Sequence, residues 1–135
     1  MKLLVADDVP ALRWLLTEIM SRDGWQVTAV GDGWETLRIA RRWQPHMVLL
    51  DLDLPGPGPS RVVAELQSLA PSPVVIVVTG MDRPEELLGD AAVHVAAVVK
   101  KPFDIHVLRE QVKKLNPIPP EGRPPGRNLA SGGGI

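Results

Sequence analysis

Short apolar runs in this chain end in side chains that can do chemistry. Four such runs, at residues 2–6, 47–50, 74–78 and 95–99, are followed in turn by the pair Asp7 and Asp8, by Asp51, by Thr79, and by Lys100 and Lys101. Burying a carboxylate is costly unless it has a partner. Apolar runs that end in acids therefore indicate a polar site shared between them, with Asp53 two positions beyond Asp51.

The types of these side chains limit what such a site can bind. Three carboxylates at one place repel one another, and their pKa values rise unless a cation lies among them. The chain has no cysteine and no suitably placed histidine, so every candidate ligand is a hard oxygen. This set favours Mg²⁺ over zinc. An aspartate can also accept a phosphoryl group as an acyl phosphate, while a threonine and a lysine hold the other phosphoryl oxygens.

The apolar runs themselves predict the elements that position these groups. They are continuous rather than alternating, which is typical of strands buried on both faces of a parallel sheet. A more polar run at residues 25–30 suits an edge strand. Helical patterns separate the runs, so β-α is repeated five times, and right-handed crossovers place helices on both faces. Ligands bind such sheets at the carboxyl ends of the strands, where all the polar groups above would meet.

Apolar spacing predicts five helices. The first begins near Pro10 and ends near Gly24, with an inward stripe of Leu12, Leu15, Leu16, Ile19 and Met20. The others are predicted at residues 33–43, after Ser60 as an N-cap, around residues 84–92, and after Asp104 as an N-cap. Trp14 lies about 200° around the first helix from Leu12. We therefore expect its ring to be in water, where a tryptophan can anchor a partner.

Composition restricts the class of protein. A chain of 135 residues that is 44% hydrophobic and 23% charged suits one globular domain, which we place at residues 1–116. Residues 117–135 are rich in proline and glycine and read as a flexible tail or linker stub. A net charge of −1 does not point to nucleic acid or an anionic membrane. The lack of cysteine and the short apolar start predict a soluble, cytoplasmic protein.

Taken in order, these residues resemble the receiver domain of two-component response regulators, the CheY-like family. The acidic pair Asp7 and Asp8, Asp51 followed by LPGPG, Thr79, and KPF at residues 101–103 carry the resemblance. It covers roughly residues 1–116. It implies a flavodoxin-like α/β fold of (βα)5 type, a doubly wound five-stranded parallel sheet with strand order 2-1-3-4-5.

The resemblance implies how a phosphoryl group would be held. Asp51 would be the phosphoacceptor, Thr79 would hydrogen-bond one phosphoryl oxygen, and Lys101 would pair with another. Gly80 matches a position where a small residue leaves the site open. Lys100 matches an apolar position without a function of its own.

The resemblance also implies a Mg²⁺ site. Asp8 would bind the ion directly, Asp7 would bind it mainly through water, and Asp51 would also be a metal ligand. The backbone carbonyl of Asp53 would supply a further ligand, while the side chain of this residue faces water.

Two positions depart from the family pattern. Val98 stands three residues before the lysine, where the family usually has Tyr or Phe, so the usual inward movement of an aromatic ring is not available. Pro57 stands where the family often has Asp, which predicts a stiffer loop without loss of chemistry.

The sequence thus predicts a phosphoacceptor rather than an enzyme. Its donor would be a histidine kinase or a histidine phosphotransfer protein, and its output would pass to an unknown protein, with no role for nucleic acid or a membrane. We expect a monomer or weak homodimer. One alternative is an aspartate-nucleophile phosphatase of the haloacid dehalogenase family, with Asp51 as nucleophile and Asp53 as acid. The other is a pseudo-receiver scaffold, favoured only by Val98.

Overall fold

The computed structural model describes residues 1–117, and the predicted tail therefore lies outside the described residues apart from Pro117. The elements follow in the order β1 (Lys2–Ala6), α1 (Pro10–Arg22), β2 (Gln26–Val30), α2 (Gly33–Trp43), β3 (Met47–Leu50), α3 (Pro59–Gln67), β4 (Val74–Thr79), α4 (Pro84–Leu88), the 3₁₀ helix η1 (Gly89–His94), β5 (Val95–Lys100) and α5 (Ile105–Leu115).

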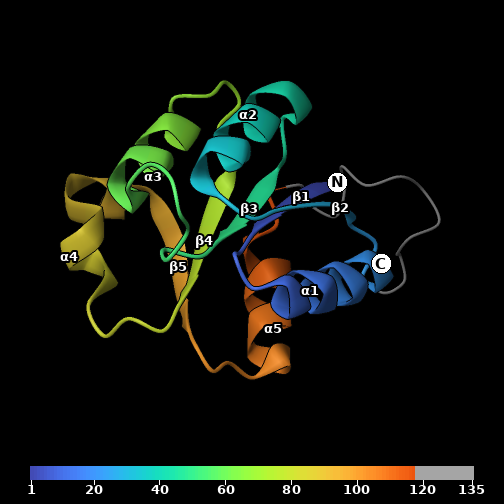
Figure 1. Ribbon diagram of the computed structural model, residues 1–135. Helices are drawn as coiled ribbons and strands as arrows, with labels where there is room; N and C mark the ends of the chain where they lie inside the picture. Colours follow the sequence, from blue (N-terminus) through green and yellow to red (C-terminus); the bar gives the residue numbers. More distant parts are fainter. Residues whose placement is uncertain (118–135) are drawn as a thin grey trace.

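The five strands form one parallel sheet in the order β2-β1-β3-β4-β5 (Figure 1). This order confirms the predicted one, and β2 is an edge strand as its polar pattern indicated. In the register of the sheet, Ala6 at the end of β1 pairs with Val30 of β2 and with Leu50 of β3. The carboxyl ends of these three strands therefore lie at one edge.

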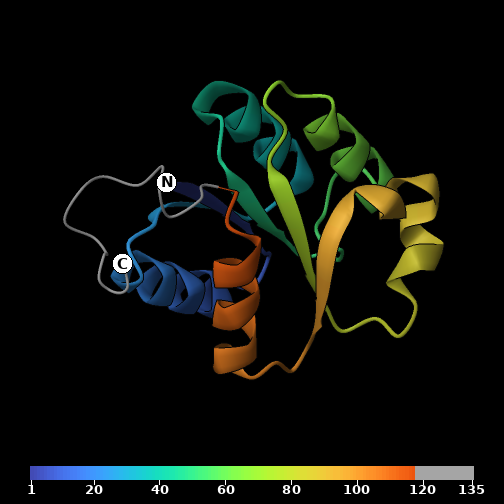
Figure 2. The same cartoon turned by 180° about the vertical axis from the view of Figure 1, so that it is seen from behind.

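Helices cover both faces of the sheet, with α2 and α3 on one side and α1 and α5 on the other (Figures 1 and 2). Alternate residues of β1 show how one strand serves both layers. Leu4 and Ala6 belong to the core under α2 and α3, whereas Leu3 and Val5 belong to the core under α1 and α5. Burial on both faces explains why the central strands read as continuous apolar runs.

The inward stripe of α1 is narrower than predicted. Leu16 and Met20 are buried, and Leu12 and Ile19 pack against the same core, but Leu15 is 41% exposed. At about 100° per residue, Leu15 lies at the rim of the stripe and reaches solvent. Leu15 as a core residue was therefore a wrong prediction.

Two helix starts and ends differ from the sequence prediction. The third helix begins at Pro59 with Gly58 as its N-cap, so the prediction of Ser60 as the cap was wrong. Proline at the first helical position needs no N–H partner, which allows the earlier start. The fourth helix stops at Leu88, because Gly89 has a φ of +55°, and the chain continues as η1.

The last strand is less buried than its sequence suggested. Alternate residues of β5, namely Ala96, Val98 and Lys100, are exposed, so one face of this edge strand is open to solvent. The prediction of burial on both faces holds for β1, β3 and β4 but not for β5. Among residues 1–117, the structure contains no helix with the length and apolar character needed to cross a membrane.

Candidate functional site

Two buried acids lie side by side at the carboxyl edge of the sheet. Asp7 follows β1 and Asp51 follows β3, and they are only 2% and 3% exposed. The N–H of Asp51 donates to the carbonyl oxygen of Ala6 at 2.9 Å, which extends the β1–β3 pairing up to the site. The strand pairing thus delivers both carboxylates to one place, as the sequence predicted.

Asp8 completes a cluster of three carboxylates. One oxygen from each of Asp7, Asp8 and Asp51 lies within 4.8 Å of the others, and Asp8 is the exposed member of the group. Three hard, anionic oxygens at this spacing fit Mg²⁺, which prefers carboxylate ligands and keeps part of its water shell. The exposure of Asp8 leaves a side from which water can complete the coordination.

Lys101 partly neutralises the cluster. Its Nζ lies 3.1 Å from Oδ2 of Asp7 and 3.0 Å from Oδ2 of Asp51. Burial lowers the pKa of Lys101, but the hydrogen bonds to the two carboxylates outweigh burial and leave the pKa above its usual value. The amine is therefore a cation at neutral pH, placed between the two buried acids.

Thr79 ends β4 and is fully buried. Its carbonyl oxygen accepts from the N–H of Lys101 at 2.7 Å, so the ends of β4 and β5 are held together. Its hydroxyl oxygen accepts from the N–H of Met81 at 3.1 Å. Because the oxygen is the acceptor in this bond, the hydroxyl proton is available for another group.

The loop after β3 is held by the start of α2. The N–H of Gly33 donates to the carbonyl oxygen of Pro55 at 2.8 Å. A Cβ at Gly56, whose φ is +109°, would lie 3.1 Å from Cδ1 of Trp34. The side chain of Asp53 is exposed, while its N–H donates to Oδ1 of Asp51 at 3.0 Å. These contacts fix the backbone beside Asp51.

Sequence reasoning missed several of these contacts. Trp34 was not singled out from the sequence; it is 55% exposed, with the guanidinium of Arg61 at 5.0 Å from its ring centroid. Lys100, read as without a function of its own, pairs with Asp82 at 2.8 Å in the loop after β4. Contacts between residues far apart in the chain leave no local signal, so spacing alone could not have found them.

Arg13 is a further residue that the sequence did not single out. Its Nη1 donates to the carbonyl oxygen of Asp7 at 2.7 Å, across the turn between β1 and α1. An arginine on a helix has many surface roles, and only the turn geometry shows that this one reaches the acidic pair.

Two residues stand apart from the cluster. Trp14 on α1 is 66% exposed, which confirms the prediction from the helical wheel. Val98 on β5 is 48% exposed. Within residues 1–117, neither residue makes a hydrogen bond or ion pair with the acids, so any role of these two residues depends on partners or on changes of state.

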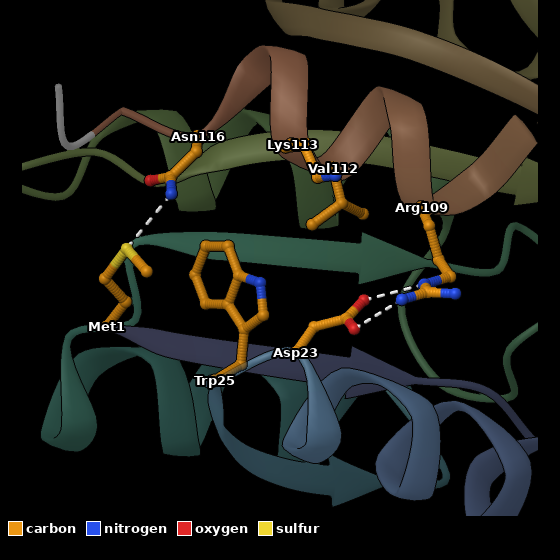
Figure 3. A pocket seen from close by; sticks show the side chains of 7 residues that line it. All are labelled: Met1, Asp23, Trp25, Arg109, Val112, Lys113 and Asn116. Carbon is orange, nitrogen blue, oxygen red and sulfur yellow. Dashed lines mark hydrogen bonds and ion pairs between the residues drawn. The ribbon is translucent and has the colours of Figure 1, made fainter. Parts of the chain in front are cut away.

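A separate cavity of about 150 Å³ lies at the opposite edge of the sheet, between the end of α1 and α5 (Figure 3). Trp25, Val112 and Met1 form its apolar lining, and Arg109 makes two hydrogen bonds to Asp23 at 2.7 and 2.8 Å. None of the predicted site residues lines it. The predicted site residues therefore lie apart from this cavity.

The sequence of this chain is similar to those of known proteins over most of its length. A family model of the response regulator receiver domain matches residues 3–113. Sporulation initiation phosphotransferase F of Bacillus subtilis is 28% identical over 117 residues, which are 87% of this chain and 94% of that protein. The probable transcriptional regulatory protein TcrX of Mycobacterium tuberculosis is 33% identical over 83% of this chain, but only 48% of TcrX is covered.

A solved structure with a similar fold is also that of a response regulator. The response regulator TrrA of Thermotoga maritima, in complex with Mg²⁺-BeF, is 26% identical with a TM-score of 0.72, covering 84% of this chain and 96% of TrrA. The chain thus spans nearly all of one sequence relative and about half of the other. With the strand order, the acid cluster and the family match over residues 3–113 in agreement, the chain belongs to the response regulator receiver domain family.

Proposed function

We propose that Asp51 accepts a phosphoryl group from a phosphohistidine of a partner protein, in a reaction that depends on Mg²⁺. The observation that carries this proposal is the setting of Asp51: a buried carboxylate 3.0 Å from a lysine cation and clustered with two further acids. Burial in such a cluster costs free energy. We therefore infer that the cluster binds a ligand that offsets this cost.

The transfer needs a nucleophile and groups that stabilise charge. A carboxylate oxygen of Asp51 attacks the phosphorus atom, the P–N bond breaks, and the leaving imidazole keeps the bonding electrons and takes a proton from solvent. Lys101 leaves its ion pair with Asp51 to hold one phosphoryl oxygen, and the hydroxyl of Thr79 donates to another. Later attack of water on phosphorus releases phosphate and restores the carboxylate.

The acid cluster is the proposed Mg²⁺ site. Asp8 and Asp51 would bind the ion directly, Asp7 mainly through water, and Asp53 through its backbone carbonyl. Mg²⁺ supplies positive charge that offsets the charge of the phosphoryl oxygens. Without the ion, three carboxylates and one ammonium leave a net charge of −2 at this edge, which repels an anionic donor.

The wider role follows from the family. Receiver domains interact with histidine kinases or phosphotransfer proteins and are signalling domains rather than conventional enzymes. We propose such a donor, a cytoplasmic location and a monomer or weak homodimer for this chain. We also propose output through protein contacts without nucleic acid. TcrX is described as a probable transcriptional regulatory protein, but the match covers only 48% of TcrX.

A labelling experiment and an assay of turnover of a simple phosphomonoester separate the alternatives. The protein is incubated with acetyl phosphate and Mg²⁺, and its intact mass is measured for wild type, Asp51→Asn and Asp53→Asn. We expect one added phosphoryl group on wild type and on Asp53→Asn, because the exposed Asp53 side chain lies outside the proposed chemistry. We expect none on Asp51→Asn, and none on wild type in excess chelator.

Each other outcome identifies a different failure. Labelling of Asp51→Asn at the wild-type level would remove Asp51 from its role, and labelling that survives the chelator would contradict the Mg²⁺ site. A folded wild type that never labels would favour the pseudo-receiver. Turnover of a simple phosphomonoester that is lost in Asp53→Asn would favour the phosphatase.

A further inference from the structure

The turn between β1 and α1 carries the acidic pair, and its backbone determines where Asp8 lies. Asp8 is exposed and has no hydrogen-bonding or ionic partner within residues 1–117. Its carboxylate is therefore directed by the turn and not by a neighbouring side chain. The peptide group that joins Asp7 to Asp8 is planar and rigid. Whatever holds the carbonyl oxygen of Asp7 thus also sets the plane from which Asp8 begins.

Arg13 holds that carbonyl oxygen. Its Nη1 donates to it at 2.7 Å, while the N–H of Asp7 donates to Val30 O at 3.1 Å on the neighbouring strand. A second restraint comes from the N–H of Val9, which donates to Oδ1 of Asp7 at 2.9 Å. Within the described part of the chain, no carboxylate lies within salt-bridge distance of Arg13. The polar contact of its guanidinium is therefore the hydrogen bond to the carbonyl oxygen of Asp7 in the turn.

Gly31 gives the guanidinium its place. A Cβ added at Gly31 would lie 3.0 Å from Nη1 and 3.6 Å from Cζ of Arg13. The guanidinium thus lies against the backbone of the loop after β2, and a methyl group at Gly31 would require it to shift by a few tenths of an ångström. This contact allows the bond to Asp7 to be disturbed without changing Arg13 itself.

We propose that Arg13 is a positioning residue for Mg²⁺: by holding the Asp7–Asp8 peptide, it keeps the Asp8 carboxylate aimed at the ion. The inference rests on the proposed Mg²⁺ site of the acid cluster. Groups that orient metal ligands without touching the metal typically change metal affinity by about 10–100-fold when they are removed. We expect the lower end here, because Val9 still restrains the turn.

The sign of the effect separates positioning from simple charge. Arg13 is a cation near a site for a cation, so its charge alone opposes Mg²⁺ binding. If charge were its main effect, its removal would strengthen Mg²⁺ binding. If positioning is its main effect, its removal weakens Mg²⁺ binding in spite of the lost repulsion.

Four variants test the proposal. Arg13→Gln replaces the guanidinium with a shorter, uncharged amide, and Arg13→Lys keeps the charge with a different reach. Gly31→Ala keeps Arg13 and requires its guanidinium to shift by a few tenths of an ångström. Arg22→Gln is the matched control, because Arg22 is an exposed arginine at the other end of the same helix, about 14 Å away along the axis.

The dissociation constant of Mg²⁺ is measured from amide chemical shifts, with thermal unfolding in chelator and the labelling rate at saturating Mg²⁺ as companion measurements. We expect about tenfold weaker binding for Arg13→Gln, weaker binding for Gly31→Ala, and an intermediate value for Arg13→Lys. Arg22→Gln should match wild type. Labelling at saturating Mg²⁺ should return close to the wild-type rate in every variant, since the reacting groups are intact.

Other results overturn the proposal in distinct ways. Unchanged or tighter Mg²⁺ binding in Arg13→Gln would show that Arg13 does not position Asp8. Wild-type affinity in both Gly31→Ala and Arg13→Lys would do the same, and these variants serve even if Arg13→Gln fails to fold. A wild type that binds no Mg²⁺ would instead refute the proposed metal site on which the inference rests.

Discussion

At the scale of single residues, the acid cluster lowers the stability of the protein at the place where we propose its function. Asp7 and Asp51 are buried beside each other, and Lys101 offers one positive charge for both. Asp8 adds a third negative charge. Active sites often retain such unfavourable arrangements because the ligand repays the cost.

Removal of one carboxylate should therefore stabilise the protein when no metal is bound. We expect Asp8→Asn to raise the free energy of unfolding in chelator by about 1 kcal/mol, because relief of repulsion exceeds the favourable effect of an acid near the start of α1. The variant should lose the stabilisation that wild type gains from Mg²⁺. Chemical unfolding with and without Mg²⁺ measures both.

The control for this prediction is an acid far from the cluster. Asp90→Asn in η1 changes an exposed acid and should shift stability by less than about 0.5 kcal/mol. Destabilisation of Asp8→Asn in chelator, or Mg²⁺ stabilisation equal to that of wild type, would contradict the account of the cluster.

His46 should make stability depend on pH near the opposite edge of the sheet. Burial, followed by repulsion from the N-terminal amine and Lys2, lowers the pKa of His46 below 6.5. Neutral His46 accepts from the N–H of Lys2 through Nδ1 at 3.0 Å. The unfolded chain binds a proton more readily, so this contribution is present above about pH 6.5 and is lost as the pH falls through the folded pKa.

The His46 prediction is tested by comparing slopes. We expect wild type to lose more stability than His46→Asn between pH 7 and pH 5, since an asparagine can accept the same hydrogen bond without taking up a proton. His106→Asn, at an exposed position of α5, should keep the wild-type slope. Parallel slopes for wild type and His46→Asn would rule out this role of His46.

At the scale of elements, the sequence predicted most of the fold because the continuous apolar runs of buried strands differ clearly from the spaced apolar residues of helices. Continuous apolar runs marked β1, β3 and β4, and α2 was predicted with its observed bounds. The errors fall where packing or a cap decides. Leu15 lies at the rim of its stripe, and Pro59 rather than Ser60 opens its helix. One face of β5 is open to solvent at the edge of the sheet, and a strand's own sequence does not reveal its place in the sheet.

Trp14 belongs to this scale because α1 presents it. We propose that α1 docks the phosphodonor with Trp14 as an anchor, since the ring is 66% exposed and α1 begins beside the acidic pair. Truncation of a packed interface tryptophan typically costs about 2 kcal/mol or more, roughly thirtyfold in affinity. Trp14→Ala should therefore reduce labelling by the cognate phosphodonor while leaving labelling by acetyl phosphate near normal.

Stability and a second exposed residue complete the Trp14 test. The free energy of unfolding should change by less than about 0.5 kcal/mol in Trp14→Ala. Val93→Ala removes another exposed apolar side chain, 82% exposed in η1, and should leave both labelling reactions unchanged. A large loss of stability would make Trp14 a core residue, and normal labelling by the phosphodonor would leave it a lone surface aromatic.

At the scale of the whole molecule, one edge of the sheet collects the chemistry. The ends of β1, β3, β4 and β5 bring together the acids, Thr79 and Lys101, and this convergence could be predicted from the sequence because parallel strands share an edge. The supporting contacts could not. Arg13 on Asp7, Lys100 on Asp82 and Trp34 on Gly56 depend on how separate loops meet.

A conformational change caused by occupancy of the site must also be transmitted without an aromatic side chain that changes its position. Val98 has no ring or hydroxyl to move between two environments, and it is already 48% exposed. We propose that occupancy of the site shifts a two-state population through Thr79 and the loops after β3 and β4. These loops are tied to their neighbours by Gly33–Pro55 and Lys100–Asp82.

The central claim, that this edge is a single site for a phosphoryl group and Mg²⁺, is tested most directly by amide chemical shifts with beryllofluoride, a mimic of the phosphoryl group. With Mg²⁺ present, we predict changes concentrated at residues 51–58 and 80–86, smaller changes along β5, and none in Asp51→Asn. Changes as large at Val98 and along α5 would contradict the proposed route. An unchanged spectrum of wild type, or changes that persist in Asp51→Asn, would contradict the site itself.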